Sequence, residues 1–560
     1  MPPSPATPAG SAAPDREEAL AAAAATDLDV LVVGGGITGA GVALDAAARG
    51  YRVALVERDD LSSGTSSKSS KLVHGGVRYL ANADVAMVAE GVRERDRLRR
   101  LAPHLVRPLG FVVPLPDLAT RAQLKAGLAL YDAIALGRNR THRYLRPGEV
   151  LRDVPGLVTG FEQGGYRYDD CQTDDSRLTL QVAQVARRLG ALVVNHAEVL
   201  GLHTTGERVV GAEVRDRLTG EAHTLRARWT VSASGVWAAT LRGLAPTPGG
   251  PELTPSKGVH LTFDGHHLPV NRAVVVPSGL DDGRMLFVIP WGGQAYVGTT
   301  DDVYDGDRDR PDLDEADAAY LCGAVNRAFG TDLTPADAVG AWAGLRPLAS
   351  GAAGATKDLS RRHVVLHDPP GLVTVTGGKL TTYRQMAEDT VDLLAAADGR
   401  AGASPTARIP LGAGGRAEDG VVRVRELAAR HGLDARAAGG LYHRHGDLAP
   451  TVLRFCLEHD GTAPLVPGLP WLAGEVRWAV RHELARTVDD VLQRRTRVSL
   501  RHAGAGGAAV ERVADVVAEE LGLDAAERAA QVEAYLDAVA HERGPVPLDL
   551  AWRGPAARAS

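Results

Sequence analysis

The segment from Ser66 to Leu80 holds the side chains best suited to chemistry on a small anionic substrate. Its serine hydroxyls and its Gly75-Gly76 pair let a backbone approach phosphates or a flat ring closely. His74, Arg78 and Tyr79 add a base, a fixed cation and a phenol. This combination predicts a cationic substrate site placed next to a bound cofactor.

The residues just before this segment have the pattern of a dinucleotide-binding unit. Asp29 to Val33 is a short apolar strand, residues 34–39 read Gly-Gly-Gly-Ile-Thr-Gly, and Ala40 to Gly50 is an alanine-rich helix. A second strand, Arg52 to Val56, ends at Glu57. Strand, G-x-G-x-x-G turn, helix, strand and acid thus follow one another at the spacing of an adenine dinucleotide site.

Each glycine of the motif, and the acid after the second strand, has a separate physical role. Gly34 permits the tight turn, Gly36 lets a pyrophosphate reach the helix N-terminus, and Gly39 allows the helix to pack closely on the strand. Glu57 lies where a carboxylate would bind a ribose hydroxyl. The alternative is an ordinary glycine-rich turn, and the motif alone does not distinguish FAD from NAD.

Six further sequence blocks along the chain resemble those of a known family, and that resemblance distinguishes FAD from NAD. They begin at Ser69, Tyr168, Ser256, Phe287, Gly344 and Gly377 and read SSKLVHGGVRYL, YDDCQTDDSRL, SKGVH, FVIPW (with GTTD from Gly298), GLRPL and GGKLTTYR. With them the chain resembles the FAD-dependent glycerol-3-phosphate dehydrogenases, of the D-amino-acid-oxidase-like flavoprotein superfamily. The resemblance runs from about Asp29 to Arg384 and resumes in the C-terminal part.

The resemblance implies FAD as the cofactor and assigns site residues by position. The implied catalytic residues are His74, His260, Arg346 and Lys379, and the implied substrate-binding residues are Arg78, Tyr79 and Arg361. The expected cofactor-binding residues are Gly34, Gly36, Ile37, Thr38, Gly39, Glu57, Arg58, Thr65, Ser66, Ser67, Ser70, Lys71, Leu72, His74, Gly75, Val199, Gly235, Gly378, Lys379, Leu380 and Thr381. For Gly235 the alternative is a plain turn glycine.

Oxidation of a secondary alcohol beside a flavin requires a base for the hydroxyl proton and cations near the substrate's negative charge. His74 and His260 are the candidate bases, because an imidazole can accept a proton at neutral pH. Either one could instead be a hydrogen-bonded structural histidine. The sequence does not choose between them.

Arginine forks suit phosphate oxygens because they form paired, charge-assisted hydrogen bonds. Arg346 is embedded in a matching block, whereas Arg361 lies in Ser-Arg-Arg-His, which departs from the family's usual Thr-Arg-Asp-Tyr, so that Arg362 competes for its role. Asp170 and Asp174 are expected to hold loops, and no metal-ligand spacing is present, so no metal is expected.

The resemblance implies oxidation of sn-glycerol 3-phosphate to dihydroxyacetone phosphate, with electrons passed to a respiratory quinone and peripheral attachment to the inner face of the cell membrane. The alternative enzyme is an oxygen-dependent glycerol-3-phosphate oxidase that produces hydrogen peroxide. A flavin-binding protein without turnover is the alternative from another class. Residues 121–136 have the composition of an interfacial helix, although a core helix fits equally well.

Composition agrees with a soluble enzyme of several domains. The 560 residues are 44% apolar and carry a formal charge of -6, which gives no global reason to expect nucleic acid. Three scattered cysteines make a disulfide framework or zinc site improbable and favour the cytoplasm. No stretch approaches the roughly 18 to 20 apolar residues that cross a bilayer.

The expected fold class is α/β: a Rossmann-like FAD-binding domain, an inserted antiparallel-sheet substrate domain and a C-terminal helical domain that serves packing or self-association as a homodimer. The short runs 192–194, 209–214 and 224–227 are expected to form a small antiparallel sheet. The expected boundaries are 28–110, 165–250 and 340–400 for the FAD domain, 111–164 and 251–339 for the substrate domain, and 410–545 for the helical domain. Residues 1–27 are expected to be a disordered tail and 546–560 a turn-rich tail.

Overall fold

The computed structural model describes residues 14–76, 84–135, 141–245, 253–280, 283–349, 363–412, 417–459 and 461–551. The chain divides into two compact units, each assembled from three separate segments. Unit 1 comprises Met1–Ser67, Ser176–Pro255 and Arg346–Gly412, and unit 2 comprises Lys68–Asp175, Ser256–Leu345 and Ala413–Ser560.

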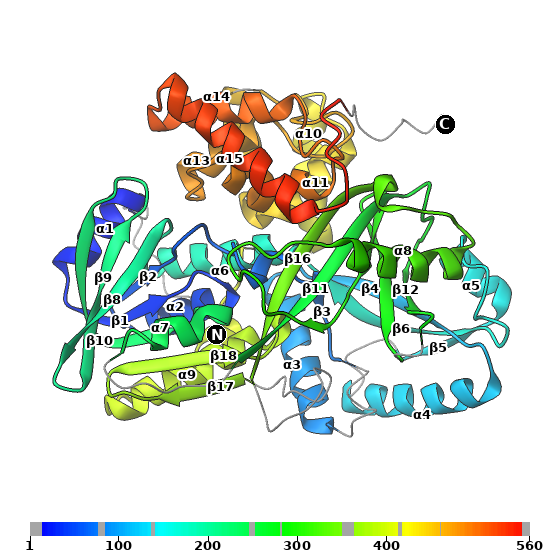
Figure 1. Cartoon of the computed structure of the whole chain (residues 1–560), viewed down its shortest axis with the longest axis horizontal. Helices are drawn as coiled ribbons and strands as arrows, with labels where there is room; N and C mark the ends of the chain where they lie inside the picture. Colours follow the sequence, from blue (N-terminus) through cyan, green and yellow to red (C-terminus); the bar gives the residue numbers. More distant parts are fainter. Residues whose placement is uncertain are drawn as a thin grey trace. The chain divides into compact units, whose positions relative to one another are not determined.

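Unit 1 is built on a sheet whose central strands run parallel (Figure 1). Its order is β17-β18-β10-β1-β2-β7, in which neighbours from β18 to β7 pair in parallel and β17 pairs antiparallel with β18. Strands buried on both faces need near-continuous apolar sequence, as in Leu28–Val33. The bounds are β1 Leu28–Val33, β2 Val53–Val56, β7 Leu192–Val194, β8 Ala197–Thr205, β9 Arg208–Asp216, β10 Ala222–Ser232, β17 His363–His367 and β18 Leu372–Gly377.

Helices cover this sheet, and the first of them after the glycine turn is the one expected from the sequence. Helix α2, Ile37–Ala48, starts at Gly36 and is almost entirely buried. It lies so close to α9 that a Cβ on Gly41 would come within 2.8 Å of the Tyr383 ring. The other helices of unit 1 are α1 Arg16–Ala25, α6 Asp175–Arg188, α7 Ala238–Arg242 and α9 Tyr383–Ala397, with short 3₁₀ turns η1 Thr65–Ser67, η3 Gly235–Trp237, η6 Leu380–Thr382 and η7 Thr406–Arg408.

The expectation of a disordered tail over residues 1–27 is wrong for its described part. Asp15 caps helix α1, and the helix buries the whole side chain of Arg16. Arg16 binds both carboxylate oxygens of Asp216 at 2.7 and 2.9 Å and donates to the carbonyls of Asn195 and His196. Alanine-rich composition suggested disorder, but a long-range buried ion pair fixes this helix.

The predicted antiparallel sheet of residues 192–227 is also partly wrong. Strands β8, β9 and β10 are antiparallel neighbours, as expected. Strand β7 instead pairs in parallel with β2, with Ala54 opposite Leu192. The hydrophobic pattern of a short apolar strand does not show which neighbouring strand it pairs with.

Unit 2 contains a second, mostly antiparallel sheet. Its main path is β15-β11-β14-β13-β12-β4-β6-β3, with β16 beside β11 and β5 beside β6. The β-rich residues 259–263, 273–276, 285–289 and 295–298 all lie in its strands, as expected for the inserted antiparallel-sheet domain. The bounds are β3 Leu72–Val73, β4 Arg107–Pro114, β5 Arg143–Leu145, β6 Gly165–Gln172, β11 Leu253–Asp264, β12 Ala273–Pro277, β13 Met285–Trp291, β14 Gln294–Gly298, β15 Asp302–Val303 and β16 Ala338–Ala349.

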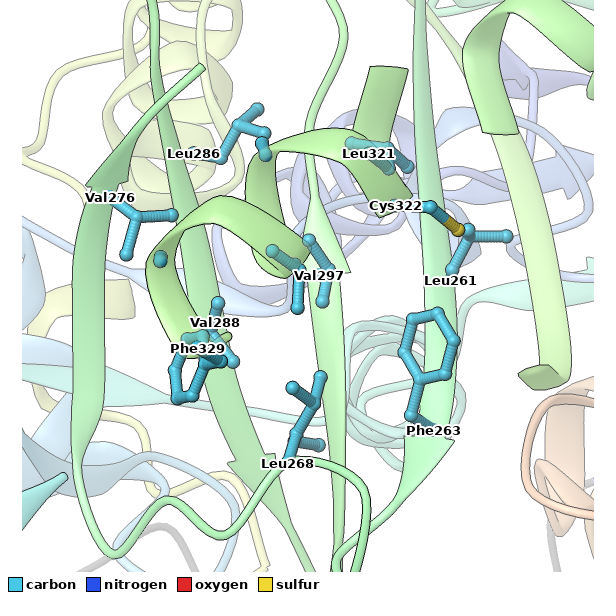
Figure 2. Close-up of a cluster of buried hydrophobic side chains, with 14 of the residues drawn as sticks. Leu261, Phe263, Leu268, Val276, Leu286, Val288, Val297, Leu321, Cys322 and Phe329 are labelled. Carbon is cyan, nitrogen blue, oxygen red and sulfur yellow. The ribbon is translucent and has the colours of Figure 1, made fainter. Parts of the chain in front are cut away.

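Helix α8, Glu315–Phe329, covers one face of this sheet. Figure 2 shows side chains of β11 to β14 pointing toward Leu321, Cys322 and Phe329 of the helix. All three helix residues are buried, and the alternation of the strands places every second side chain on this face. The cluster is the hydrophobic core that holds the sheet rigid. The remaining helices before residue 345 are α3 Val85–Leu101, α4 Leu118–Ala135, α5 Pro147–Asp153 and the 3₁₀ turn η4 Pro335–Asp337.

The expected domain boundaries differ from these units in several places: residues 340–345 lie in unit 2, and the helical residues from 413 onward are part of unit 2 and not a separate unit. Residues 68–110 and 165–175 were placed in the FAD domain, but β3, β4 and β6 pair with one another in the second sheet. Their assignment to the FAD domain followed from the proximity of residues 68–110 to the glycine turn in the sequence. Strand pairing across about 100 residues, as between Val73 and Cys171, instead places them in the second sheet.

The C-terminal part is helical, as predicted, and its helices form one group, yellow to red in Figure 1. They are α10 Ala417–Arg430, α11 Ala435–His445, α12 Ala449–Glu458, α13 Gly474–His482, α14 Ala509–Leu521 and α15 Ala525–Arg543, with the short turns η8 Gly446–Leu448, η9 Asp490–Arg495 and η10 Val498–Leu500. Helix α13 does not continue past His482, and Leu484, two residues later, has a φ of 62°. The predicted tail from 546 begins with the buried Val546.

Candidate active site

Four parallel strands of unit 1 end at one edge of the sheet, and one predicted cofactor-binding residue follows each of those ends. Gly34 follows β1, Glu57 follows β2, Gly235 follows β10 closely, and Gly378 follows β18. Ligands of open parallel sheets bind outside the carboxyl ends of the strands. The topology therefore gathers residues from positions 34 to 378 at one edge.

The glycine turn between β1 and α2 leaves no room for side chains. A Cβ on Gly39 would lie 1.9 Å from the Gly34 carbonyl oxygen, and Gly34 itself has a φ of 112°. Gly36 is the N-cap of α2 and offers no side-chain cap. The amide of Ile37, at the helix start, donates to Ser66 Oγ at 2.9 Å. Helix N-terminus and serine thus form one cradle for an anionic group.

Glu57 lies beside this turn and is held by backbone donors. Its carboxylate accepts from the Gly35 amide at 2.6 Å and from the Asp59 amide at 2.9 Å. Burial raises the pKa of Glu57, and these two amides oppose the rise. Next to it the Arg58 guanidinium stacks over the Trp237 ring, 5.1 Å from its centroid. Trp237 is a neighbour that sequence reasoning did not select.

The other predicted residues of unit 1 lie on several elements. Lys379 caps the 3₁₀ turn that contains Leu380 and Thr381, directly after Gly378, whose φ is 73°. Val199 lies half-buried in β8. Arg346 lies half-buried in β16. Thr38 is within α2, and Thr65 and Ser67 flank Ser66 in η1.

Ser70, Lys71, Leu72, His74, Gly75 and His260 belong to unit 2. There the segment Ser69–Lys71 is fixed by the buried carboxylate of Asp175, which accepts from the Ser69 amide at 3.0 Å and its hydroxyl at 2.7 Å. The Lys71 ammonium lies 3.1 Å from the same carboxylate and 4.6 Å from the Trp342 ring centroid. Burial lowers the pKa of Lys71 to about 8, with the charge of Arg497 adding to the shift and Asp175 opposing it.

His260 lies within an aromatic cluster that we define as His260, Trp291, Tyr296 and Trp342. Its ring stacks on Trp342 at 4.6 Å, and its Nε2 is 2.8 Å from Ser70 Oγ. Two members of the aromatic cluster hold the same segment, because Trp342 donates to the Ser69 carbonyl at 3.2 Å and Tyr296 to the Ser70 carbonyl at 2.9 Å. The imidazole is 2% exposed, so its orientation is set by packing.

His74 is half-buried at the end of β3, on a loop fixed by a second buried carboxylate. Asp170 accepts from the Gly75 amide at 3.2 Å and from Arg95 at 2.6 Å. Tyr131 donates to Asp170 at 2.9 Å. Burial raises the pKa of Asp170, and the charge of Arg95 opposes this. Asp170 therefore holds a loop, as predicted from the sequence.

Three predicted substrate-binding residues, Arg78, Tyr79 and Arg361, lie outside the described residues, as does the competing Arg362.

Comparisons with known proteins match both parts of the chain. Residues 29–384 fit the family of FAD dependent oxidoreductases, and residues 404–528 fit the C-terminal domain of alpha-glycerophosphate oxidase. A glycerol-3-phosphate dehydrogenase of Mycobacterium leprae is 39% identical over 513 residues, which cover 90% of this chain and 87% of that protein. The chain belongs to the FAD-dependent oxidoreductase family, in the branch that contains the glycerol-3-phosphate dehydrogenases.

Solved structures agree with this family. The FAD complex of a glycerol-3-phosphate dehydrogenase from Bacillus halodurans is 32% identical, has a TM-score of 0.78, and covers 95% of this chain and 98% of that chain. An FAD-bound L-alpha-glycerophosphate oxidase from Mycoplasma pneumoniae, with 19% identity, a TM-score of 0.52 and 66% of this chain and 94% of that chain covered, shows the fold alone.

The residues of this oxidoreductase fit FAD on their own geometry. The three glycines 34–36 and the N-terminus of α2, to which Gly36 gives no side-chain cap, suit a pyrophosphate, and the Glu57 carboxylate suits a ribose. Arg58 and Trp237 offer a flat cationic and aromatic surface beside them.

Sequence reasoning on this oxidoreductase missed the second layer of the site. Asp175 lies inside the block that begins at Tyr168, but the sequence indicates no role for it, nor for Trp342 or Arg95. Their partners are distant: 104 residues separate Asp175 from Lys71, and 75 separate Arg95 from Asp170. The one available signal was the pair of acidic doublets in the block at Tyr168, because a carboxylate that becomes buried needs a charged or hydrogen-bonding partner.

Proposed function

We propose that this enzyme oxidises sn-glycerol 3-phosphate to dihydroxyacetone phosphate and passes the electrons to a quinone. The secondary alcohol loses its hydroxyl proton to a base and its carbon-bound hydrogen as hydride. FAD, when bound, supplies the hydride acceptor. The observation that carries the proposal is identity of 32 to 39% over at least 90% of the chain with proteins named glycerol-3-phosphate dehydrogenases.

We assign the proton transfer to His260. A base works when its ring is held in one orientation and can pass its proton onward. Stacking on Trp342 fixes the plane of His260, and the Ser70 hydroxyl at 2.8 Å from Nε2 gives a hydrogen-bonded route for the proton. His74, on the loop fixed by Asp170, is the second candidate. Comparing the variants His260→Gln and His74→Gln tells the two apart, because loss of the base removes the pH dependence of the reduction rate.

Cations bind the phosphate in this proposal. Arg346 provides a guanidinium fork, and Lys379 lies at the start of η6 where it can oppose negative charge on the substrate or the ring system. Arg78, Tyr79 and Arg361 stay predictions of the resemblance.

A quinone acceptor requires contact with a membrane surface, and α4 has a face suited to it. Its inner face packs Leu128 and Tyr131 into unit 2, so the prediction of a core helix holds for that side. Its outer face exposes Leu118 and Leu130, at 66% and 43%, together with several alanines. Exposed basic side chains, Lys125 on the helix and Arg143 after it, complement anionic headgroups. In the part of the chain that the structure describes, no helix is long and apolar enough to cross a membrane.

The acceptor is tested by supplying substrate with a soluble quinone in air. Quinone reduction without stoichiometric hydrogen peroxide supports the dehydrogenase. Stoichiometric peroxide in the presence of quinone would make the enzyme an oxidase and remove the quinone from the proposal.

Membrane contact is tested separately by co-sedimentation with vesicles that contain anionic lipid. The double variant Leu118→Glu and Leu130→Glu should lose most of the binding. The matched control is Leu218→Glu, at a leucine of unit 1 that is 44% exposed. Equal binding by all three proteins would exclude α4 as the contact.

A further inference from the structure

We propose that Asp175 is a positioning residue through which the C-terminal helical domain orders the segment Ser69–Lys71, and with it the Ser70–His260 pair. The consequence for turnover rests on the proposed function, whereas the ordering of the segment does not. All of these residues belong to unit 2.

Asp175 lies at the centre of a buried set of donors. Its Oδ2 accepts both Ser69 donors, and its Oδ1 receives the Lys71 ammonium at 3.1 Å and the Arg497 guanidinium at 3.0 Å. Asp175 is 0% exposed and Arg497 is 2% exposed. Ser69 and Lys71 come from the segment, while Arg497 comes from the C-terminal domain, 322 residues away from Asp175.

The charges make each member depend on the others. One buried carboxylate serves two buried cations, so its removal leaves the Arg497 guanidinium with the more exposed Asp174, 3.7 Å from Nε, and takes away the nearest carboxylate of Lys71. Burial alone would raise the pKa of Asp175, but the charges of Lys71 and Arg497 hold it below its ordinary range. Loss of any one of the three charges therefore destabilises the other two.

Arg497 is itself held rigidly. It adopts a left-handed backbone conformation with a φ of 59° and donates through Nη1 to the Gln493 carbonyl at 2.9 Å. A second contact between the same domain and the segment's start joins Lys68 to Glu542 of α15. The C-terminal domain therefore holds this segment at two points.

The segment transmits its position to His260 directly. Ser70 follows Ser69, its carbonyl accepts from Tyr296, and its hydroxyl bonds His260. Displacing Ser69 from Asp175 therefore moves the Ser70 hydroxyl away from the His260 imidazole. A misplacement of about 1 Å in a reacting group can lower a rate about a hundredfold.

The experiment compares Asp175→Asn, Arg497→Met and Arg497→Lys with Arg477→Met in the full-length, FAD-loaded protein. Arg477 is a matched control because it is a buried arginine of the same domain that pairs with Glu519 and Glu520. Hydrogen exchange of the peptide 68–76 is measured first, and then the rate and substrate affinity of anaerobic flavin reduction by glycerol 3-phosphate.

We expect Asp175→Asn and Arg497→Met to speed exchange in this peptide and to lower the reduction rate at least tenfold, with little change in substrate affinity. Arg497→Lys should change the exchange and the reduction rate less than Arg497→Met does, and Arg477→Met should change neither quantity. Unaltered exchange in both of the first two variants would overturn the proposal. If those variants do not fold, Ser69→Ala carries the test; it removes one hydrogen bond to Asp175 and the acceptor of the Lys71 amide, so the expected smaller rise is measured at amides of the peptide other than Lys71. Unaltered exchange at those amides would then overturn the proposal.

The two proposals fail in different ways. If glycerol 3-phosphate does not reduce the wild-type flavin, the proposed function is wrong, and exchange in the peptide still decides whether Asp175 orders the segment.

Discussion

The imidazole of His260 stacks on the indole of Trp342, with ring centroids 4.6 Å apart and planes within 7°. Gly298, opposite His260 in the sheet, permits this, because a Cβ there would lie 2.1 Å from the imidazole Cδ2. Packing therefore leaves the ring a single orientation, and Ser70 takes up the hydrogen bond that this orientation offers.

Two substitutions of Trp342 should distinguish the contribution of its stacking on His260 from that of its hydrogen bond to the Ser69 carbonyl. Trp342→Phe keeps an aromatic face but loses the Nε1 donor, and should cost about 1 kcal/mol of stability. Trp342→Ala opens a cavity and should cost about 3 to 5 kcal/mol and most of the activity. Denaturant unfolding and turnover check both, and a wild-type rate in the alanine variant would show that the stack does not position His260.

Gly39→Ala should abolish FAD binding. The added Cβ meets the Gly34 carbonyl oxygen at 1.9 Å, so the turn that we expect to bind the pyrophosphate must shift. Gly201→Ala is the control, because its Cβ meets nothing within 4 Å in the same unit. Flavin content after gel filtration measures the effect, and full occupancy in Gly39→Ala would show that the turn does not contact the cofactor.

The hydrogen bonds of Asp170 to Arg95 and Tyr131 should stabilise the folded protein as well as hold the loop of His74. Arg95→Met leaves the buried Asp170 carboxylate without its cation and should cost about 3 to 5 kcal/mol. Tyr131→Phe removes one neutral donor and should cost about 1 kcal/mol. Urea unfolding of the two variants checks this order, and equal losses would contradict it.

Arg346→Ala should weaken binding of phosphorylated substrate far more than retention of FAD. Arg228→Ala, at an arginine of the same unit that pairs with Asp398, serves as control. Substrate affinity from flavin titration and flavin content from absorbance give the two quantities. Unchanged substrate affinity in Arg346→Ala would move the phosphate site elsewhere.

The C-terminal domain should lose stability in acid through Glu475. Burial alone would raise the pKa of Glu475, but Arg444 and His445 lower it to about 2. Because the folded pKa lies below the unfolded one, this stabilisation, on the order of 3 kcal/mol, is present above about pH 4.5 and is lost as the pH falls toward 2. Unfolding free energies of wild type and Glu475→Gln at pH 7 and about pH 3 test this. Equal losses in the two proteins would contradict it.

The parts of the site that follow from local sequence were predictable. Gly34 to Glu57 form one strand-turn-helix-strand unit, and its geometry depends on neighbours within about 25 residues. Residues whose role depends on distant partners were not predictable. Arg16 looked like part of a tail because Asp216 is 200 residues away, and Asp175 had no visible role because Arg497 is 322 residues away. Strand β7 was misassigned for the same reason, since pattern gives a strand but not its neighbour.

The proposed function is tested most directly by anaerobic absorbance of the FAD-loaded protein at about 450 nm, where oxidised flavins absorb. Adding sn-glycerol 3-phosphate should bleach this band, while glycerol and an amino acid should leave it unchanged. A band that persists with glycerol 3-phosphate in a fully flavin-loaded protein would contradict the assignment of this substrate and would leave only the family and the fold.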